Sequence, residues 1–282
     1  MTRDSQIATL YVVATPLGNL GDLSPRAAEV LRTVPVVAAE DTRRTRQLLS
    51  HLEAHPKLLS FHAHSEPGRL QELASLVERG TDVALVTDAG TPAVSDPGAT
   101  LVQAVRDRGG DVVPIPGPSA VITALSASGF SADRFIFLGF LPRKGAERER
   151  LLRQVAQSEL TVVLFEAPPR LHGLLEDLAR EAGEERRAAV ARELTKLHEE
   201  TRVGTLAELA GHYGKTEPRG ECTVVVEGSE PPLAPVADSE AARAIASRLL
   251  ATGVTRREAA RQVAVETGLS RNAAYRLVME LP

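Results

Sequence analysis

The chain has 282 residues, 43% of them hydrophobic, which is enough for two ordinary domains and a small appendage. Its single cysteine, Cys222, excludes a disulfide framework, and no signal peptide or membrane-length apolar run is evident, so we expect a soluble protein of the reducing cytoplasm. A formal charge of −4 argues against simple electrostatic binding of nucleic acid but leaves room for local basic patches.

The first half of the chain alternates strands and helices. Residues 7–15 form an apolar, β-branched run typical of a strand, and Ser24 followed by Pro25 predicts the start of a helix. The pattern recurs four times, ending near residue 129. Five such units predict an α/β fold with a largely parallel sheet and helices on both faces.

Beyond residue 142 the pattern changes. One further strand and helix, over residues 159–183, precede three strand-like segments with little helix between them, which predicts a mixed sheet with antiparallel pairs. We therefore expect an N-terminal α/β domain over residues 1–142 and a second α/β domain over residues 143–228.

The last part of the chain has a different composition. Residues 229–238 are rich in proline and predict an extended linker to a helical module over residues 239–282. Thr255 and Glu258 predict a capping box, and Gly268 predicts the turn of a helix-turn-helix. This module carries seven arginines against four glutamates, which favours nucleic-acid binding over a plain helical cap.

Loops with unusual glycine and proline content follow the strands of the first domain: "ATPLGNLGD", "AEDTRRTR", "TDAGTPAVSDPG" and "PIPGPSA". In a parallel sheet these loops meet at one edge, where ligands bind, although none of them is a dinucleotide fingerprint or a P-loop. In the third loop, Asp96 and Pro97 predict a helix start, while Pro92 and Gly90 offer a stiff, bare wall. That loop could hold a ligand or simply be a rigid connection.

From about residue 8 to residue 228 the motifs "ATPLGNLGD", "AAEDTRRTRQLL", "TDAGTPAVSDPG", "PGPSAVITALSASG", "FLGFLPRK", "FEAPPRL" and "ARELTKLHEE" occur in order. This series resembles the 16S ribosomal RNA (cytidine-2'-O)-methyltransferase family of the tetrapyrrole (precorrin) methylase superfamily. The resemblance implies two α/β domains with S-adenosylmethionine in the cleft between them, a homodimer and no metal. It also implies a target cytidine at position 1402 of 16S rRNA, in the small ribosomal subunit.

The resemblance further implies which residues hold the methyl donor. Pro16 and Gly18 would lie toward the acceptor, and the second domain would contribute across the cleft. The implied donor-binding residues are Pro16, Asp88, Ala89, Gly90, Thr91, Pro92, Ser119, Ala120, Phe165, Glu166 and Leu194.

A ribose hydroxyl is a poor nucleophile near neutral pH, so we expect a base or a strong hydrogen-bond acceptor nearby. The carboxylate candidates are Glu40, Asp41, Glu166 and Glu193. The first two could instead cap the following helix, and the last two could pair with Arg170 or Arg192.

Lys196 is a further catalytic candidate. Only four of the 33 basic residues are lysine, and the family motif has lysine at this position. A neutral amine in the cleft could take the ribose proton, whereas a charged ammonium could hold a phosphate or pair with Glu193 or Glu199.

Basic residues near the expected cleft and in the tail would suit RNA phosphates. The candidates are Arg43, Arg44, Arg46, Arg143, Lys144 and Arg271. His62 and His64 lack an evident third ligand, so we expect no metal site. A tetrapyrrole C-methyltransferase and a ligand-sensing helix-turn-helix regulator are the alternative functions, and the basic loop "TRRTR" together with the tail favours RNA.

Overall fold

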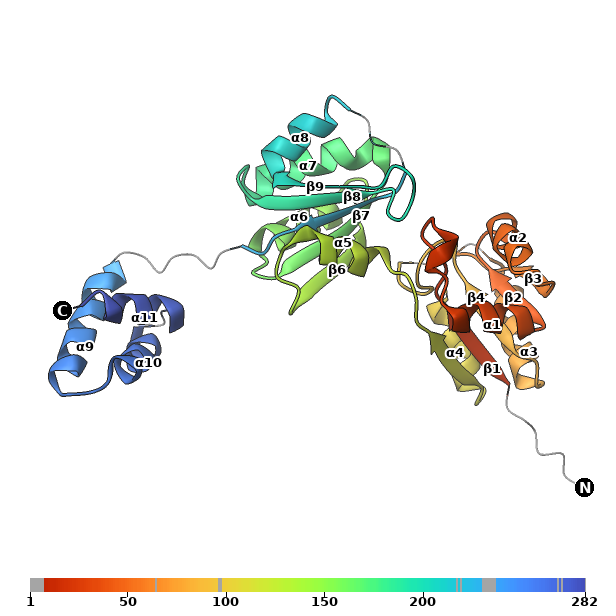
Figure 1. Cartoon of the computed structure of the whole chain (residues 1–282), viewed down its shortest axis with the longest axis horizontal. Helices are drawn as coiled ribbons and strands as arrows, with labels where there is room; N and C mark the ends of the chain where they lie inside the picture. Colours follow the sequence, from red (N-terminus) through yellow and green to blue (C-terminus); the bar gives the residue numbers. More distant parts are fainter. Residues whose placement is uncertain are drawn as a thin grey trace, which may run out of the picture. The chain divides into compact units, whose positions relative to one another are not determined.

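The computed structural model describes residues 8–63, 65–95, 98–216, 218, 220–229, 237–267, 269 and 271–281. Its contacts divide the chain into two compact units, Met1–Ser229 and Glu230–Pro282. Among the described residues, the first unit contains two five-stranded sheets, and the second contains three helices (Figure 1).

The first sheet is parallel throughout, which confirms the prediction from the alternating pattern. Its strands are β1 (Thr9–Val13), β2 (Val36–Ala39), β3 (Lys57–Ser60), β4 (Val83–Val86) and β5 (Asp111–Ile115), in the order β3-β2-β4-β1-β5. The chain leaves β1 toward β2 and leaves β4 toward β5, in opposite directions along the sheet. Loops that diverge in this way open a crevice at the carboxyl ends of the two strands.

Helices cover both faces of this sheet, as predicted. On one face lie α1 (Pro25–Thr33) and α2 (Thr42–His51), and on the other α3 (Pro67–Glu78) and α4 (Ala99–Asp107). Ser24 caps α1 by accepting a hydrogen bond of 3.1 Å from the N–H of Ala27. Strands β2 and β4 are buried at every residue, because both of their faces are covered.

The chain passes to the second sheet earlier than the sequence predicts. Helix α5 (Ala120–Ser128) packs against β7, β8 and β10, and β6 (Phe135–Phe140) pairs in parallel with β7 (Thr161–Glu166). The change of sheet therefore lies between β5 and α5, ahead of the expected boundary at residues 142 and 143. The strand–helix pattern continues through this point, because a helix has the same apolar spacing whichever sheet it covers.

The second sheet is mixed, as predicted. Its order is β6-β7-β10-β8-β9, with β8 at Arg187–Arg192, β9 at Glu200–Thr205 and β10 at Cys222–Val226. Strand β10 is antiparallel to β7 and β8, and β9 is antiparallel to β8. Helix α5 covers one face, and α6 (Ala146–Gln157), α7 (Pro168–Ala182) and α8 (Leu206–Tyr213) cover the other.

The C-terminal unit contains α9 (Ala237–Ala251), α10 (Arg256–Thr267) and α11 (Arg271–Met279), which pack around small side chains such as Ala246, Ala259 and Ala274. Thr255 Oγ1 accepts a hydrogen bond of 3.3 Å from the N–H of Glu258, one half of the expected capping box. Gly268 and residues 230–236 of the expected linker lie outside the described residues, so the helix-turn-helix assignment stays a prediction. Among the described residues, no helix has the length and apolar character needed to cross a membrane.

Candidate active site

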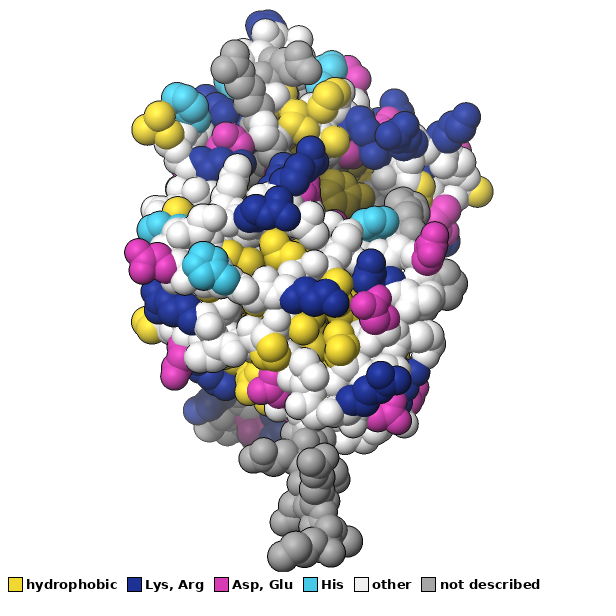
Figure 2. Space-filling model, turned by 90° about the vertical axis from the view of Figure 1, so that its right-hand side faces the viewer, with side chains coloured by type: hydrophobic (Ala, Val, Ile, Leu, Met, Phe, Trp, Pro, Cys, Tyr) yellow, Lys and Arg dark blue, Asp and Glu magenta, His cyan; other side chains and the backbone are white. Residues whose placement is uncertain are grey.

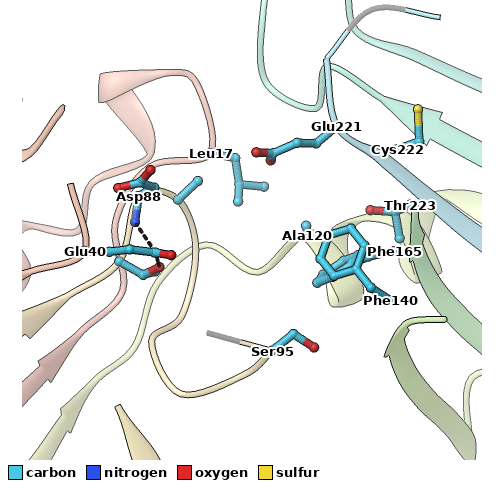
Figure 3. Close-up of a pocket in the computed structure, with 12 residues that line it drawn as sticks. Leu17, Glu40, Asp88, Ser95, Ala120, Phe140, Phe165, Glu221, Cys222 and Thr223 are labelled. Carbon is cyan, nitrogen blue, oxygen red and sulfur yellow. Dashed lines mark hydrogen bonds between the residues drawn. The ribbon is translucent and has the colours of Figure 1, made fainter. Parts of the chain in front are cut away.

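A cavity of about 170 Å³ lies between the carboxyl edge of the first sheet and the second sheet (Figure 3). The loops after β1, β2 and β4 form one wall, and α5, β6, β7 and the start of β10 form the other. The lining residues are Leu17, Glu40, Thr87, Asp88, Ala89, Ser95, Ala120, Phe140, Phe165, Glu221, Cys222 and Thr223. Adjoining hollows of about 230 and 480 Å³ share Leu17 and Asp88 with it. The space is therefore a branched cleft.

The loop after β4 is tied to the loop after β1 by two reciprocal backbone hydrogen bonds. The N–H of Thr15 donates to the carbonyl of Gly90 at 2.9 Å, and the N–H of Gly90 donates to the carbonyl of Thr15 at 3.0 Å. Gly90 has a φ of +86°, and a Cβ there would lie 3.3 Å from Leu17 Cδ2. Gly90 is buried, its amide is already bonded, and it lines none of the three hollows, whereas Asp88 and Ala89 of the same loop line the cavity.

Two loops that face the cleft contain non-glycine residues with left-handed backbone. In the loop after β4, Ala93 and Ser95 have φ values of 67° and 61°, and in the loop after β8, Glu193 and Thr195 have 50° and 65°. Such conformations cost on the order of 1–3 kcal/mol each and cluster at functional sites. The expected helix start at Asp96 and Pro97 lies outside the described residues, and α4 begins at Ala99.

Two acidic side chains come together at the ends of β2 and β4. Glu40 Oε2 accepts hydrogen bonds from Thr87 Oγ1 at 2.5 Å and from the N–H of Asp88 at 3.3 Å. Asp88 Oδ1 accepts one of 3.0 Å from the N–H of Asp41, and Asp88 Oδ2 lies 3.5 Å from Arg44 Nη1. Burial, followed by the nearby Glu40 charge, raises the pKa of Asp88, while Arg44 opposes the shift.

Asp41 serves as the cap of α2. Its carboxylate accepts hydrogen bonds from the N–H of Arg43 at 2.8 Å and from Arg43 Nη2 at 2.9 Å. These bonds lower the pKa of Asp41 to about 2. Such a carboxylate is a weak base, so the geometry favours the capping alternative for Asp41.

Phe165 and Glu166 point to opposite sides of β7, because side chains alternate along a strand. Phe165 faces the cleft, with its ring centroid 4.9 Å from that of Phe137 and 5.5 Å from that of Phe140. Glu166 is 1% exposed, and its Oε2 lies 3.1 Å from Arg170 Nη2 of α7. Glu166 therefore pairs with Arg170, which was the alternative to a catalytic role for this carboxylate.

Lys196 lies just beyond the carboxyl end of β8, as predicted. Its Nζ is 2.8 Å from Glu193 Oε1, whereas Arg192 pairs with Glu200 at 2.7 Å. A Cβ at Gly18 would overlap the Lys196 stem and lie 3.0 Å from its Cε. The loops after β1 and β8 thus touch across the cleft.

The other expected donor-site residues lie near the cleft with differing surroundings. Ala120 lines the cavity, and Ser119 precedes α5 without a side-chain capping bond. Thr91 Oγ1 donates a hydrogen bond of 3.1 Å to the carbonyl of Pro118. Pro92 and Leu194 are buried, and Pro16 lines the hollow of about 230 Å³ together with Gly18 and Arg44.

The expected RNA contacts on the first unit are exposed: Arg43, Arg44, Arg46, Arg143 and Lys144. Figure 2 shows that lysine and arginine side chains on one face of the molecule are dispersed among acidic ones. Arg271 begins α11, but its side chain lies outside the described set. His64 does too, and no group of three described His, Cys, Asp or Glu side chains could hold a metal ion.

Sequence reasoning missed several lining residues: Leu17, Thr87, Phe140, Glu221, Cys222 and Thr223. The sequence argument placed ligand-binding residues only at the carboxyl ends of strands. Because β10 is antiparallel to β7 and β8, its amino end, with Glu221 and Cys222, lies at the same edge as their carboxyl ends. The predicted antiparallel pairs were the signal that could have placed these residues in the cleft.

The sequence matches the family described as Tetrapyrrole (Corrin/Porphyrin) Methylases over residues 9–210. The chain belongs to this family. A protein of Synechocystis sp. named "Ribosomal RNA small subunit methyltransferase I" is 47% identical to this methylase over 96% of the chain and 98% of its own length. A protein of the same name from Xylella fastidiosa is 45% identical over 95% and 97%.

A solved structure supports the fold of this methylase. The uroporphyrin-III C-methyl transferase from Thermus thermophilus, complexed with S-adenosyl homocysteine, aligns with a TM-score of 0.58 at 20% identity. The alignment covers 78% of this chain and 97% of that one. At this level of identity the likeness establishes a shared architecture.

Proposed function

We propose that this methylase transfers a methyl group from S-adenosylmethionine to the ribose 2'-hydroxyl of a cytidine in 16S rRNA, at position 1402. It is a methyltransferase that acts on the small ribosomal subunit in the cytoplasm. It works as a homodimer and without a metal ion.

The observation that carries this proposal is the similarity to ribosomal RNA methyltransferases over nearly the full chain. Relatives with 39–47% identity, which match at least 95% of this chain, have the name "Ribosomal RNA small subunit methyltransferase I". Three solved tetrapyrrole methyltransferases that align with the chain are 19–24% identical and cover 78–80% of it. The comparison therefore favours RNA over a tetrapyrrole as the acceptor, and it favours an enzyme over a ligand-sensing regulator.

The chemistry of the cavity fits S-adenosylmethionine. The rings of Phe140 and Phe165 offer an apolar wall for a planar base, and Glu221 and Asp88 offer acceptors for its amino and hydroxyl groups. Such carboxylates also favour a cation nearby. Gly90 places no side chain against Leu17, whose Cδ2 would lie 3.3 Å from an added Cβ. The bound donor would supply an electrophilic methyl group on a positively charged sulfur.

The remaining donor-site residues predicted from the sequence would line the donor cavity or hold its loops in place. Asp88 and Ala89 line the cavity directly, and Thr91 fixes the loop after β4 to the loop before α5. Pro92, Ser119, Ala120 and Leu194 would complete the donor site, with Pro16 toward the acceptor. Glu166 would act through Arg170 and the turn into α7, because it points away from the cavity.

The adjoining hollow of about 480 Å³ fits a nucleotide acceptor. It is lined by Arg44 and Asp88 from the first domain and by Lys196 and Glu221 from the second. Two cations on opposite walls suit the phosphates that flank a ribose. The chain's own contribution to the reaction is to hold donor and acceptor at near-attack distance and to exclude water.

RNA outside the cleft would be bound by exposed cations. Arg43 and Arg46 lie on α2 beside the hollow, and Arg143 and Lys144 follow β6. Arg271 and the other arginines of the C-terminal unit would add a second contact if this unit is the helix-turn-helix that the sequence predicts. Each contact would weaken with salt, as phosphate contacts do.

A transfer assay with three acceptors tests this function. Tritiated S-adenosylmethionine is incubated with the protein and small subunits that lack the modification, free 16S rRNA or uroporphyrinogen III. We expect label in the small subunits and none in the tetrapyrrole. Label in the tetrapyrrole alone would assign the alternative reaction, and no label with any acceptor despite donor binding would favour the regulator.

A further inference from the structure

We propose that the side chain of Asp88 is the general base that accepts the ribose proton during methyl transfer. This inference rests on the proposed function and assigns a role within the same site. The sequence placed only the backbone around Asp88 in the donor site. Among the described titratable side chains, Asp88 alone lines all three spaces of the cleft.

Asp88 lies where the branches of the cleft meet. It lines the donor cavity with Phe165 and Ala120, the hollow beside Pro16 and Gly18, and the hollow that contains Lys196. Figure 3 shows Asp88 and Glu221 on opposite sides of Leu17. A group that transfers a proton must reach the reacting atoms, which lie between donor and acceptor. The junction of the three spaces satisfies this condition.

The surroundings of Asp88 fix the carboxylate and leave one oxygen for the acceptor. Oδ1 accepts the backbone hydrogen bond from Asp41, and Oδ2 faces Arg44 at 3.5 Å, beyond the length of a good hydrogen bond. The side chain is 28% exposed. Oδ2 can therefore approach a substrate hydroxyl without the loss of an existing short bond.

The electrostatic setting strengthens Asp88 as a base. Burial and the neighbouring charge of Glu40 raise its pKa, and a higher pKa means a greater affinity for a proton. The charged groups around it are Glu40, Asp41, Arg43 and Arg44 from the first domain. Lys196 and Glu221 face the same hollow from the second domain.

The other candidates are committed to different partners. Asp41 is bonded to Arg43, Glu166 points toward α7, and Glu193 and Lys196 neutralise each other. Glu40 accepts from Thr87 and from the N–H of Asp88, and so helps to orient Asp88. This arrangement makes Glu40 a positioning residue.

The step balances without any further reagent. As the bond forms between the ribose oxygen and the methyl carbon, the carbon–sulfur bond breaks and its electron pair stays on sulfur. The sulfonium thereby becomes a neutral thioether. The proton of the hydroxyl moves to Asp88 Oδ2, so that the carboxylate becomes a carboxylic acid, which later releases this proton to water.

Single-turnover methylation of unmodified small subunits tests the assignment, with Asp88→Asn as the main variant. Asparagine keeps the size and the acceptor for the Asp41 N–H but is not basic. We expect the rate at saturating S-adenosylmethionine to fall on the order of 10²-fold or more. Donor affinity is measured separately by calorimetry, and rates are compared at saturating S-adenosylmethionine, because Asp88 also lines the donor cavity. Asp107→Asn is a matched control on α4, where Asp107 accepts a hydrogen bond from Gln103 and lines none of these hollows.

The pH dependence separates proton transfer from a structural role. The wild-type rate should rise with pH at the acidic end and reach a plateau, because Asp88 must be ionised to accept the proton. In Asp88→Asn this rise should disappear, and Asp88→Glu should recover part of the rate. The proposal is overturned by an Asp88→Asn rate within about threefold of wild type, by a slow rate that keeps the wild-type pH rise, or by a loss that saturating donor restores. If the wild-type protein labels no RNA, the proposed function itself fails.

Discussion

Lys196 Nζ lies 2.8 Å from Glu193 Oε1, and the stem of the same lysine packs against Gly18 from the opposite side of the cleft. Lys196 is thus held in an ion pair, an arrangement that suits a phosphate contact better than removal of a proton. We expect Lys196→Arg to keep the single-turnover rate within about threefold of wild type and Lys196→Ala to weaken binding to small subunits. Loss of methylation in the arginine variant with RNA binding retained would instead make Lys196 the base.

Gly18 provides the space that Lys196 occupies. A methyl group there would overlap Lys196 Cγ, so Gly18→Ala should displace the lysine and lower the rate of RNA methylation on the order of 10²-fold. Gly173→Ala in α7 is the control, since its added Cβ meets no atom within 4 Å and alanine favours a helix. Single-turnover rates for both variants check this, and equal activity would show that Lys196 is not constrained by Gly18.

Gly90→Val should abolish binding of S-adenosylmethionine, because the branched side chain would push against Leu17, which lines the cavity. The structure adds a second effect. At a φ of +86° any L side chain is strained, so we also expect a loss of stability on the order of 1–3 kcal/mol. Calorimetry on the folded variant, with its melting temperature recorded, separates the two, and unchanged donor affinity would refute the role of this loop.

The C-terminal unit should contribute RNA affinity but not donor binding. A protein that ends at Ser229 keeps the whole cleft, since every cleft residue precedes that position. We expect it to bind S-adenosylmethionine normally and to methylate small subunits poorly at physiological salt, with a smaller deficit at low salt. Equal turnover by both forms at limiting substrate would show that α9, α10 and α11 have another role.

The free energy of unfolding should fall at alkaline pH because the thiol of Cys222 and the hydroxyl of Tyr213 are buried. Burial raises the pKa of Cys222 and of Tyr213 to about 12 each. In the unfolded chain both groups lose their protons at lower pH, so between about pH 8.5 and 12 the folded state binds more protons and stability decreases as pH rises. Urea unfolding at pH 7 and pH 10 measures this, and Cys222→Ala should show a smaller decrease. A pH-independent midpoint would mean that neither group is protected by folding.

Periodicity and turn chemistry predicted much of the fold. The apolar runs that form β2 and β4 predicted buried parallel strands, and the segments before and after "ARELTKLHEE" predicted antiparallel pairs. The expected domain boundary at residues 142 and 143 lies after the point where the chain enters the second sheet. The apolar spacing of α5 predicts a helix, but it does not tell which of the two sheets that helix packs against. The family motif placed both Phe165 and Glu166 at the donor site. Because side chains alternate along β7, these adjacent residues point in opposite directions, and only Phe165 faces the cleft.

The site was predictable where it depends on strand ends and not where it depends on tertiary contacts. Lys196 and the loop from Asp88 to Pro92 follow strands directly, so their place at one edge could be expected. Glu221 reaches the same edge only because β10 runs the other way. The reciprocal bonds between Thr15 and Gly90 join segments 75 residues apart, which no local pattern reveals.

The most direct test of the account is the identity of the methylated atom. Small subunits that lack the modification are incubated with the protein and S-adenosylmethionine, and their 16S rRNA is digested to nucleosides and short fragments for mass spectrometry. We predict a single new 2'-O-methylcytidine in the fragment that contains position 1402, absent when the Gly90→Val variant is used. Methylation of a base instead of a ribose, or no methylated nucleoside from a protein that binds the donor, would contradict it.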